Sequence, residues 1–220
     1  GEGLYKRGYR AVGVEAPLRE TLAAALVTLS RYRGRDPFCD PFCGSGTLLI
    51  EAALKATNTA PGLRRFFSAE RFGFIPENIW REERMRAQDL IVHNIDFRAQ
   101  GFDNDPNAVA LTNENAEKAG MKKYVKAAVG DIRDFTVPDE RCLVITNPPY
   151  GERLLDVKAA EELYTVMGQR FKEGCGRKYY IISPHDEFER FFGREADKRR
   201  KLYNGMIKCQ LFMYFKNRER

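Results

Sequence analysis

The sequence lacks the features that mark membrane proteins, disulfide-stabilised secreted domains and zinc proteins. No stretch approaches the ~18 consecutive apolar residues of a membrane-spanning helix, and the polar N-terminus has no apolar secretion signal. The five cysteines are odd in number, and Cys39 and Cys43 have no second pair at a matching spacing. The two histidines lie far from them in the chain. We therefore expect a metal-free protein of the reducing cytoplasm, with no membrane partner.

The glycine-rich loop at residues 40–47 lacks the residues of two common nucleotide-binding motifs. No Gly-Lys-Ser/Thr follows it, which excludes a phosphate-binding Walker loop, and Leu49 stands where a dinucleotide fingerprint has its third glycine. What is present is a strand end, a tight turn and a helix-forming run. Glycine has no Cβ, so Gly44 and Gly46 allow a ligand to approach the backbone N–H groups at the start of that helix. The alternative is a turn that binds nothing.

Positive charge is in excess and is clustered. The net charge is +6 and the isoelectric point is near 9.1. Lysine and arginine are dense in residues 5–10 and 194–201, where tyrosine and phenylalanine lie among or beside them. Aromatic rings can stack on bases while the cations bind phosphates, so we expect a nucleic-acid partner. A basic enzyme with a solvated charged face is the alternative.

The order of predicted elements indicates a doubly wound α/β domain spanning residues 1–220. Strands are expected at 36–40, 97–103, 124–129, 142–146 and 178–182, and helices at 17–29, 47–54, 82–95, 106–119, 161–172 and 187–192. Such alternation predicts a mostly parallel sheet. Asn204-Gly205, between two strand-like runs, predicts a C-terminal antiparallel hairpin. Residues 57–95 are expected to be an insertion that folds over one end of the sheet, with Met85, Leu90 and Ile91 facing inward.

Acidic residues follow two of the predicted strands. Ligands of open α/β sheets bind beyond the carboxyl ends of the strands. Asp103 ends one strand and can accept hydrogen bonds from ribose hydroxyls, and the insertion accounts for its distance from the glycine loop. Asp105 is a rival for that role but is better placed as a helix cap. Asp131 can accept from an adenine amino group while Ile132 packs on the ring, although a turn aspartate is an equal alternative.

The most specific signal is the Asn-Pro-Pro-Tyr segment at residues 147–150, which follows a continuously apolar strand. Its two prolines fix φ and remove two N–H donors, so carbonyl groups remain as acceptors. The Asn147 amide oxygen and the Pro148 carbonyl can both accept from one exocyclic amino group. Tyr150 supplies a flat face for an extruded base. The alternative is a Pro-Pro turn after a buried strand.

These motifs resemble a known enzyme family. Asp-Pro-Phe-Cys-Gly-Ser-Gly-Thr followed by Asn-Pro-Pro-Tyr is similar to S-adenosylmethionine-dependent amino methyltransferases. The likeness extends over residues 6–10, 16–21, 147–154 and 196–198 and the pair Asn204-Gly205. These segments resemble the catalytic domain of bacterial RNA guanine-N2 methyltransferases that follow a THUMP domain. Such proteins are often labelled N6-adenine-specific DNA methylases.

The resemblance implies S-adenosyl-L-methionine as the cofactor. Gly44 and Gly46 would line its methionine portion, and Asp40 would anchor its amino group. Asp103 would hold the ribose hydroxyls, and Asp131 the adenine. Three further cofactor-binding candidates belong to the same loops: Phe42, Thr47 and Ile132.

The resemblance also implies the substrate. Asn147, Pro148 and Tyr150 would be the catalytic residues that position a base, and the reaction would methylate an exocyclic amino group in RNA, guanine N2 of ribosomal RNA first. We expect an upstream RNA-binding domain outside this chain. Three alternatives stay open: an adenine-N6 methyltransferase acting on DNA or RNA, a non-catalytic RNA-binding module with a cofactor pocket, and a small-molecule methyltransferase. Asn147 reads an amino group and does not by itself distinguish adenine from guanine.

Overall fold

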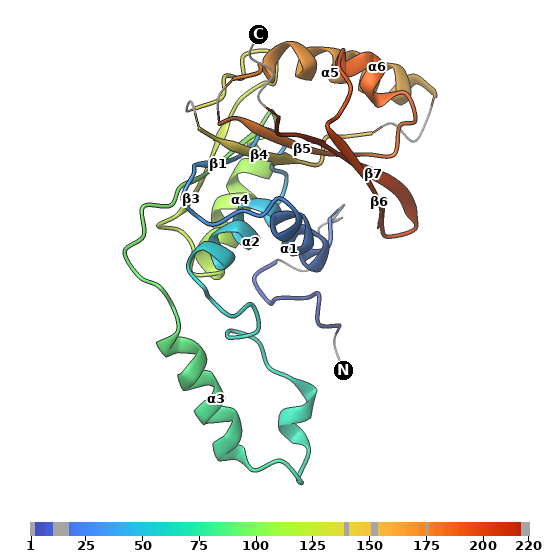
Figure 1. The fold of residues 1–220 in the computed structure, drawn as a ribbon. Helices are drawn as coiled ribbons and strands as arrows, with labels where there is room; N and C mark the ends of the chain where they lie inside the picture. Colours follow the sequence, from blue (N-terminus) through green and yellow to red (C-terminus); the bar gives the residue numbers. More distant parts are fainter. Residues whose placement is uncertain (1–2, 11–17, 139–140, 151–153, 175, 217–220) are drawn as a thin grey trace.

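The computed structural model describes residues 3–10, 18–138, 141–150, 154–174 and 176–216, and its centre is a seven-stranded sheet (Figure 1). The strands are β1 (Phe38–Asp40), β2 (Ala99–Asp103), β3 (Val125–Val129), β4 (Leu143–Thr146), β5 (Lys178–Ser183), β6 (Lys198–Asn204) and β7 (Ile207–Tyr214). Their order is β3-β2-β1-β4-β5-β7-β6. The first five pair in parallel, and β7 runs antiparallel to β5 and β6. The mostly parallel sheet with a C-terminal hairpin confirms the predicted fold class.

Helices cover both faces of the sheet (Figure 1). They are α1 (Glu20–Leu29), α2 (Thr47–Ala56) and α4 (Pro106–Lys118) on one face, and α5 (Leu154–Arg170) and α6 (Phe188–Phe192) on the other. Each face has its own cluster of buried side chains, with Leu26 and Leu49 in one and Tyr164, Met167 and Phe188 in the other. Among the described residues, no helix has both the length and the apolar character needed to cross a membrane.

Local sequence signals set the boundaries that matter for the site. Asp105 caps α4, because its Oδ1 accepts from the backbone N–H of Asn107 at 2.9 Å and Pro106 occupies the first helical turn. Gly120 ends this helix region with a φ of 74°, a conformation that favours glycine. All four residues of β4 are buried, as expected of a strand covered on both faces. The strand therefore delivers the segment that follows it to a fixed place at the sheet edge.

The segment predicted to fold over one end of the sheet does not do so (Figure 1). Residues 57–95 form an arm that extends away from the body and carries a short 3-10 helix (Ser68–Arg71) and α3 (Glu77–Asp89) (Figure 1). None of the residues of α3 is buried, and Met85 and Leu90 are 55% and 57% exposed. The prediction that they face inward is wrong. An apolar face on a helix does not specify which surface, if any, covers it.

Candidate functional site

The carboxyl ends of four parallel strands bring the predicted loops to one edge of the sheet. Across this edge the order is Asp131 after β3, Asp103 at the end of β2, Asp40 at the end of β1, and Asn147 after β4. The strand order reverses between β1 and β4, because β1 pairs with both β2 and β4. Such a switch point is where open α/β sheets bind ligands. The glycine loop and Asn147 lie on its two sides.

The glycine loop is open on its outer side. Gly44 and Gly46 have φ values of 52° and 80°, and a Cβ placed on Gly44 would meet no atom of the described residues within 4 Å. The N–H of Gly44 donates to Oδ2 of Asp103 at 2.9 Å, which joins the loop to the end of β2. Oδ1 of Asp103 accepts from the N–H of Asp105 at 3.0 Å. The loop therefore leaves space beside Gly44, whose N–H is bonded to the carboxylate of Asp103, while the N–H of Gly46 donates to the Cys43 carbonyl oxygen.

Two buried polar residues of α4 hold this loop from beneath, and sequence reasoning missed both. Thr112 donates from Oγ1 to the carbonyl oxygen of Gly44 at 2.7 Å, and Asn115 donates from Nδ2 to that of Ser45 at 3.0 Å. A Cβ on Gly46 would lie 2.7 Å from Cγ2 of Thr112. Thr112 and Asn115 are fully buried. Polar residues on the inward face of a helix were the available signal, because buried polar groups need partners.

Asp40 is the last residue of β1, and its side chain contacts the neighbouring strand β4. Its carboxylate is buried, and Oδ1 accepts from Thr146 Oγ1 at 2.7 Å and from the Phe42 N–H at 3.1 Å. Burial raises the pKa of Asp40 to about 7, against the lowering effect of these two hydrogen bonds. Asp40 thus joins the ends of β1 and β4, while half-buried Phe42 continues the loop. Thr146 was not among the predicted site residues.

Tyr9 and Arg10 of the basic segment near the N-terminus turn inward, whereas Tyr5 and Lys6 are exposed. Arg10 donates from Nη2 to Thr47 Oγ1 at 2.5 Å and to the Leu18 carbonyl oxygen at 2.9 Å. Tyr9 is 4% exposed and donates to Oε1 of Glu51 at 3.2 Å. The expectation that aromatic rings in residues 5–10 stack on bases is therefore wrong for Tyr9. This segment supports the start of α2 and the glycine loop.

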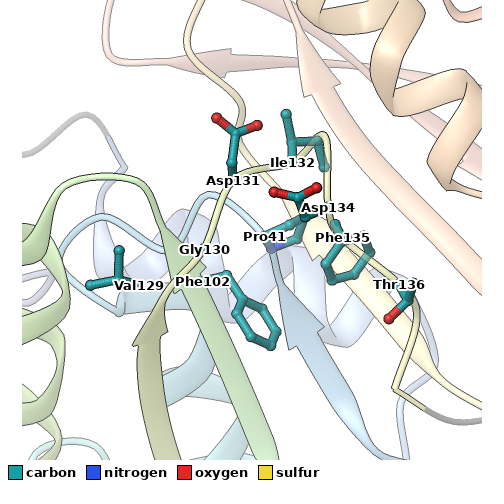
Figure 2. Close-up of a pocket in the computed structure, with 9 residues that line it drawn as sticks. All are labelled: Pro41, Phe102, Val129, Gly130, Asp131, Ile132, Asp134, Phe135 and Thr136. Carbon is teal, nitrogen blue, oxygen red and sulfur yellow. The ribbon is translucent and has the colours of Figure 1, made fainter.

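A hollow of about 310 Å³ lies beside the loop that follows β3 (Figure 2). Its lining residues are Pro41, Phe102, Val129, Gly130, Asp131, Ile132, Asp134, Phe135 and Thr136. In Figure 2 the side chains of Asp131 and Ile132 rise from this loop, and the rings of Phe102 and Phe135 lie beside it. Oδ2 of Asp131 is 2.9 Å from Nη1 of Arg133. The hollow combines an apolar floor with a carboxylate at its rim.

The sequence-predicted residues do not all line this hollow. Asp131 and Ile132 are lining residues, and so is Pro41 of the glycine loop, whereas Gly44, Asp103 and the segment after β4 are not. The predicted residues lie at the same edge of the sheet, but they follow different strands and are therefore spread along that edge. The edge thus has the 310 Å³ hollow at the β3 side and the open glycine loop near the switch point.

The Asn147 side chain carries an unused acceptor. Its Oδ1 is buried, and among the described residues it has no hydrogen-bond partner. Pro148 is buried next to it, and Pro149 is exposed. A buried amide oxygen without a partner costs roughly 1–3 kcal/mol. A donor from a bound molecule would satisfy this oxygen; Oδ1 of Asn115, beneath the glycine loop, is likewise buried without a partner among the described residues.

The C-terminal hairpin holds Tyr150. Asn204, at the end of β6, is 6% exposed and donates from Nδ2 to the Tyr150 hydroxyl oxygen at 2.7 Å. Burial raises the pKa of Tyr150, and its hydrogen bonds with Asn204 and Asn147 act in the opposite direction. Asn204 can reach Tyr150 because the hairpin extends beyond the end of β5. Ser183, the last residue of β5, pairs with Gln210 of β7, and the hairpin continues past this point to the pair Asn204 and Ile207. The sequence predicted Asn204 as a turn residue but gave no sign of this contact.

The Tyr150 hydroxyl is therefore held from the hairpin side by Asn204, and it also interacts with the Asn147 side chain. In the sheet order, β5, β7 and β6 lie on one side of β4, and β1, β2 and β3 lie on the other. Asn147 stands between these two halves of the edge. One half offers a hollow and an open glycine loop, and the other offers a fixed aromatic side chain.

The chain is similar to known methyltransferases over most of its length. Residues 7–212 match the family described as RMKL-like, methyltransferase domain. The chain is 41% identical over 215 residues to the protein named “Putative RNA methyltransferase YpsC” of Bacillus subtilis, covering 98% of this chain and 56% of that protein. It is 43% identical over 219 residues to the ribosomal RNA large subunit methyltransferase K/L of Vibrio campbellii, covering 95% of this chain and 31% of that protein.

A solved structure shares both the fold and much of the sequence. The crystal structure of “SMU.472, a putative methyltransferase complexed with SAH” superposes with a TM-score of 0.93 at 40% identity. The match covers 100% of this chain and 58% of that one. The chain thus spans about half the length of YpsC and of SMU.472, and about a third of the K/L protein.

Proposed function

The chain belongs to the RMKL-like methyltransferase domain family, and we propose that it transfers a methyl group from S-adenosyl-L-methionine to an exocyclic amino group of a base in RNA. The finer proposal is guanine N2 in ribosomal RNA, acting in the cytoplasm. The names of the YpsC and K/L relatives, an RNA and a ribosomal RNA methyltransferase, support RNA as the substrate. Because the relatives are much longer, we propose that a further part of the whole protein contributes to RNA binding.

The observation that carries the proposal is the unpartnered oxygen of Asn147. An exocyclic amino group has two N–H donors, and one of them can satisfy the buried Oδ1. The Pro148 carbonyl is the second acceptor that we propose for this group. Tyr150, fixed by Asn204, would stack on the base. Asn147 and Pro148 together would orient the amine nitrogen toward the glycine loop.

The residues on the other half of the edge fit the cofactor. Gly44 leaves open space beside its backbone, and Asp103 is placed at the same loop for the ribose hydroxyls. The hollow with Asp131 and Ile132 has the apolar surface and rim carboxylate suited to adenine. Gly46, Thr47, Phe42 and Asp40 complete the proposed cofactor set. When bound, the cofactor supplies a methyl group already activated on a sulfonium.

The protein's own contribution is positioning. An asparagine is not a base, so Asn147 holds the amino group by accepting a hydrogen bond and does not take its proton. The nitrogen loses that proton to water after it has formed the bond to the methyl group and the carbon–sulfur bond has broken. Alignment of two reacting groups can contribute about 7–11 kcal/mol in favourable cases. Asp40, with its raised pKa, is buried under the loop and hydrogen-bonded to Thr146, so it keeps β1 and β4 in register rather than moving protons.

The direct test is Asn147→Ala. Calorimetry should give unchanged cofactor affinity, and a methyl-transfer assay on RNA should give turnover reduced by roughly a hundredfold or more, as misplacement of a reacting group can cause. Thr165→Ala is a matched control, because Thr165 is exposed and its hydroxyl donates to the Glu161 carbonyl oxygen on α5. Full turnover in Asn147→Ala would remove Asn147 from the mechanism.

A further inference from the structure

A second hollow, on the opposite edge of the sheet, is strongly basic. It has a volume of about 540 Å³ and is lined by Thr28, Leu29, Ser30, Arg31, Lys178, Tyr180, Lys198, Arg200, Met213 and Phe215. We call it the basic groove. Arg31 follows α1, Lys178 begins β5, and Lys198 and Arg200 lie on β6. Four cations from three separate elements thus meet around one hollow.

Among the residues that the structure describes, no carboxylate lines the basic groove. Within the described part of the chain, none of its four cations forms an ion pair. Asp197 precedes Lys198 but does not line the groove, and its Oδ2 accepts from the backbone N–H groups of Phe215 and Lys216 at 2.7 Å. Four like charges around one hollow repel one another, and a bound polyanion would relieve that repulsion.

Protection of an exposed sheet edge is the simplest alternative explanation for the charges on β6. Edge strands carry lysines that discourage pairing with another chain. That explanation covers Lys198 and Arg200, but it does not cover Lys178 on an interior strand or Arg31 after a helix. Convergence of all four on one hollow therefore points to a ligand.

The direction of β6 links the basic groove to the candidate site. β6 begins at Lys198 beside the groove and ends at Asn204, which holds Tyr150. Lys198, Arg200, Leu202 and Asn204 lie on one face of this strand, because side chains alternate. The six residues of β5, Lys178–Ser183, separate the two edges by roughly 15–20 Å. That distance corresponds to a few nucleotides of extended chain.

We propose that the basic groove binds the phosphate backbone of the same RNA whose base enters the candidate site. The identity of the polyanion as RNA rests on the proposed function. Lysine and arginine neutralise phosphates without reading sequence, so the groove anchors the strand. The half-exposed ring of Phe215 at its rim is available for stacking on a base. An acidic protein segment would use the cations but would have no need of this ring.

The test is the salt dependence of RNA binding by Lys198→Gln/Arg200→Gln. Both side chains are exposed, so the substitutions should leave stability almost unchanged. Fluorescence anisotropy with a short labelled single-stranded RNA gives affinity across a range of salt concentrations. The slope of log affinity against log salt should become shallower by about 1.4, because each lost phosphate contact removes about 0.7 for a single strand. Affinity at physiological salt should fall several-fold.

The matched control is Lys118→Gln/Lys122→Gln, which removes the same charge. Both lysines are exposed and pair with Glu114 and Glu117 of α4, which packs on β2 and β3 at the other end of the strand order. This variant should keep the original slope. An unchanged slope in the groove variant overturns the proposal, and so does self-association of that variant with unaltered RNA binding, which would show edge protection alone. Loss of binding to labelled poly-glutamate, with RNA binding intact, would also overturn it in favour of an acidic protein.

The groove and the proposed function can fail separately. If the groove variant shows the shallower slope but the unsubstituted protein does not methylate RNA, the basic groove is supported as an RNA-binding surface and the proposed reaction is wrong. If RNA is methylated but the slope is unchanged, the reaction stands and the groove falls. Calorimetric affinity for the cofactor should be the same in both variants.

Discussion

At the scale of single residues, the contact between Asn204 and Tyr150 determines where the proposed base-stacking ring lies. The two residues are 54 positions apart in the chain and meet at 2.7 Å. Asn204 touches neither of the proposed reacting groups, so it is a positioning residue. Its effect should pass through the Tyr150 hydroxyl, and this can be separated from a general effect on folding.

We expect Asn204→Ala to lower methyl-transfer turnover by about tenfold, with unchanged cofactor affinity. A double-mutant cycle with Tyr150→Phe checks the route, because Phe lacks the hydroxyl that Asn204 contacts. In the Tyr150→Phe background, Asn204→Ala should cost almost nothing further, since coupled residues give non-additive effects. Full additivity of the two substitutions would contradict this role.

The raised pKa of Asp40 predicts how stability changes with pH. The folded protein keeps this proton up to about pH 7, whereas the unfolded chain loses it near 3.8. The folded state therefore binds more protons between these values, and stability falls as pH rises through that window. Glu51 acts in the same direction, because burial raises its pKa from 4.5 to about 7.

We expect Asp40→Asn to reduce this loss of stability, by roughly 2–4 kcal/mol between pH 4 and pH 7. The substitution keeps an oxygen that can accept from Thr146 and Phe42 but removes the titration. Urea denaturation at a series of pH values measures the effect. Glu51→Gln is the companion variant. It should remove the part of the pH-dependent loss of stability that comes from Glu51 and leave the part that comes from Asp40. An Asp40→Asn curve parallel to the original would refute the assignment.

At the scale of elements, the contact between the glycine loop and α4 explains why position 46 needs glycine. A side chain there faces two costs, the positive φ of 80° and a clash with Thr112 at 2.7 Å. Gly193 has nearly the same φ, 82°, and a Cβ added there would meet nothing within 4 Å, so it isolates the backbone cost. Comparing substitutions at Gly46 and Gly193 therefore separates the cost of the backbone conformation from the cost of the clash with Thr112.

We expect Gly46→Ala to destabilise the protein by about 1–3 kcal/mol more than Gly193→Ala does, as measured by urea denaturation. Gly46→Ala should also weaken cofactor binding in calorimetry, because the clash displaces the loop. Equal destabilisation by the two substitutions would show that Thr112 does not constrain the loop.

The arm provides the opposite case, an apolar side chain that contributes little to stability. Met85 on α3 is 55% exposed, whereas Met167 on α5 is completely buried. We expect Met85→Ala to change the free energy of unfolding by less than about 0.5 kcal/mol. Met167→Ala should cost about 2–5 kcal/mol, because it leaves a cavity in the core. A large effect at Met85 in the isolated chain would mean that the arm packs against the body.

At the scale of the whole molecule, features set by local sequence were predictable and those set by distant contacts were not. The parallel strands, the Asp105 cap and the Asn204-Gly205 hairpin each follow from neighbouring residues. The outward course of the arm and the inward turn of Tyr9 and Arg10 depend on what surface is available, which no local pattern records. The same is true of Thr112, Asn115 and the Asn204 contact. Residue types at strand ends predicted the edge where the site lies, and tertiary packing decided which side chains support it.

The central claim is that this edge holds an exocyclic amino group of an RNA base against the unused oxygen of Asn147. The most direct measurement is mass spectrometry of nucleosides after incubating the protein with ribosomal RNA, in parallel with DNA, and isotopically labelled S-adenosyl-L-methionine. We expect the label in RNA on an exocyclic amine, as N2-methylguanosine. Label confined to DNA, to a ring nitrogen or to a ribose hydroxyl, or no label in any nucleoside, would contradict it.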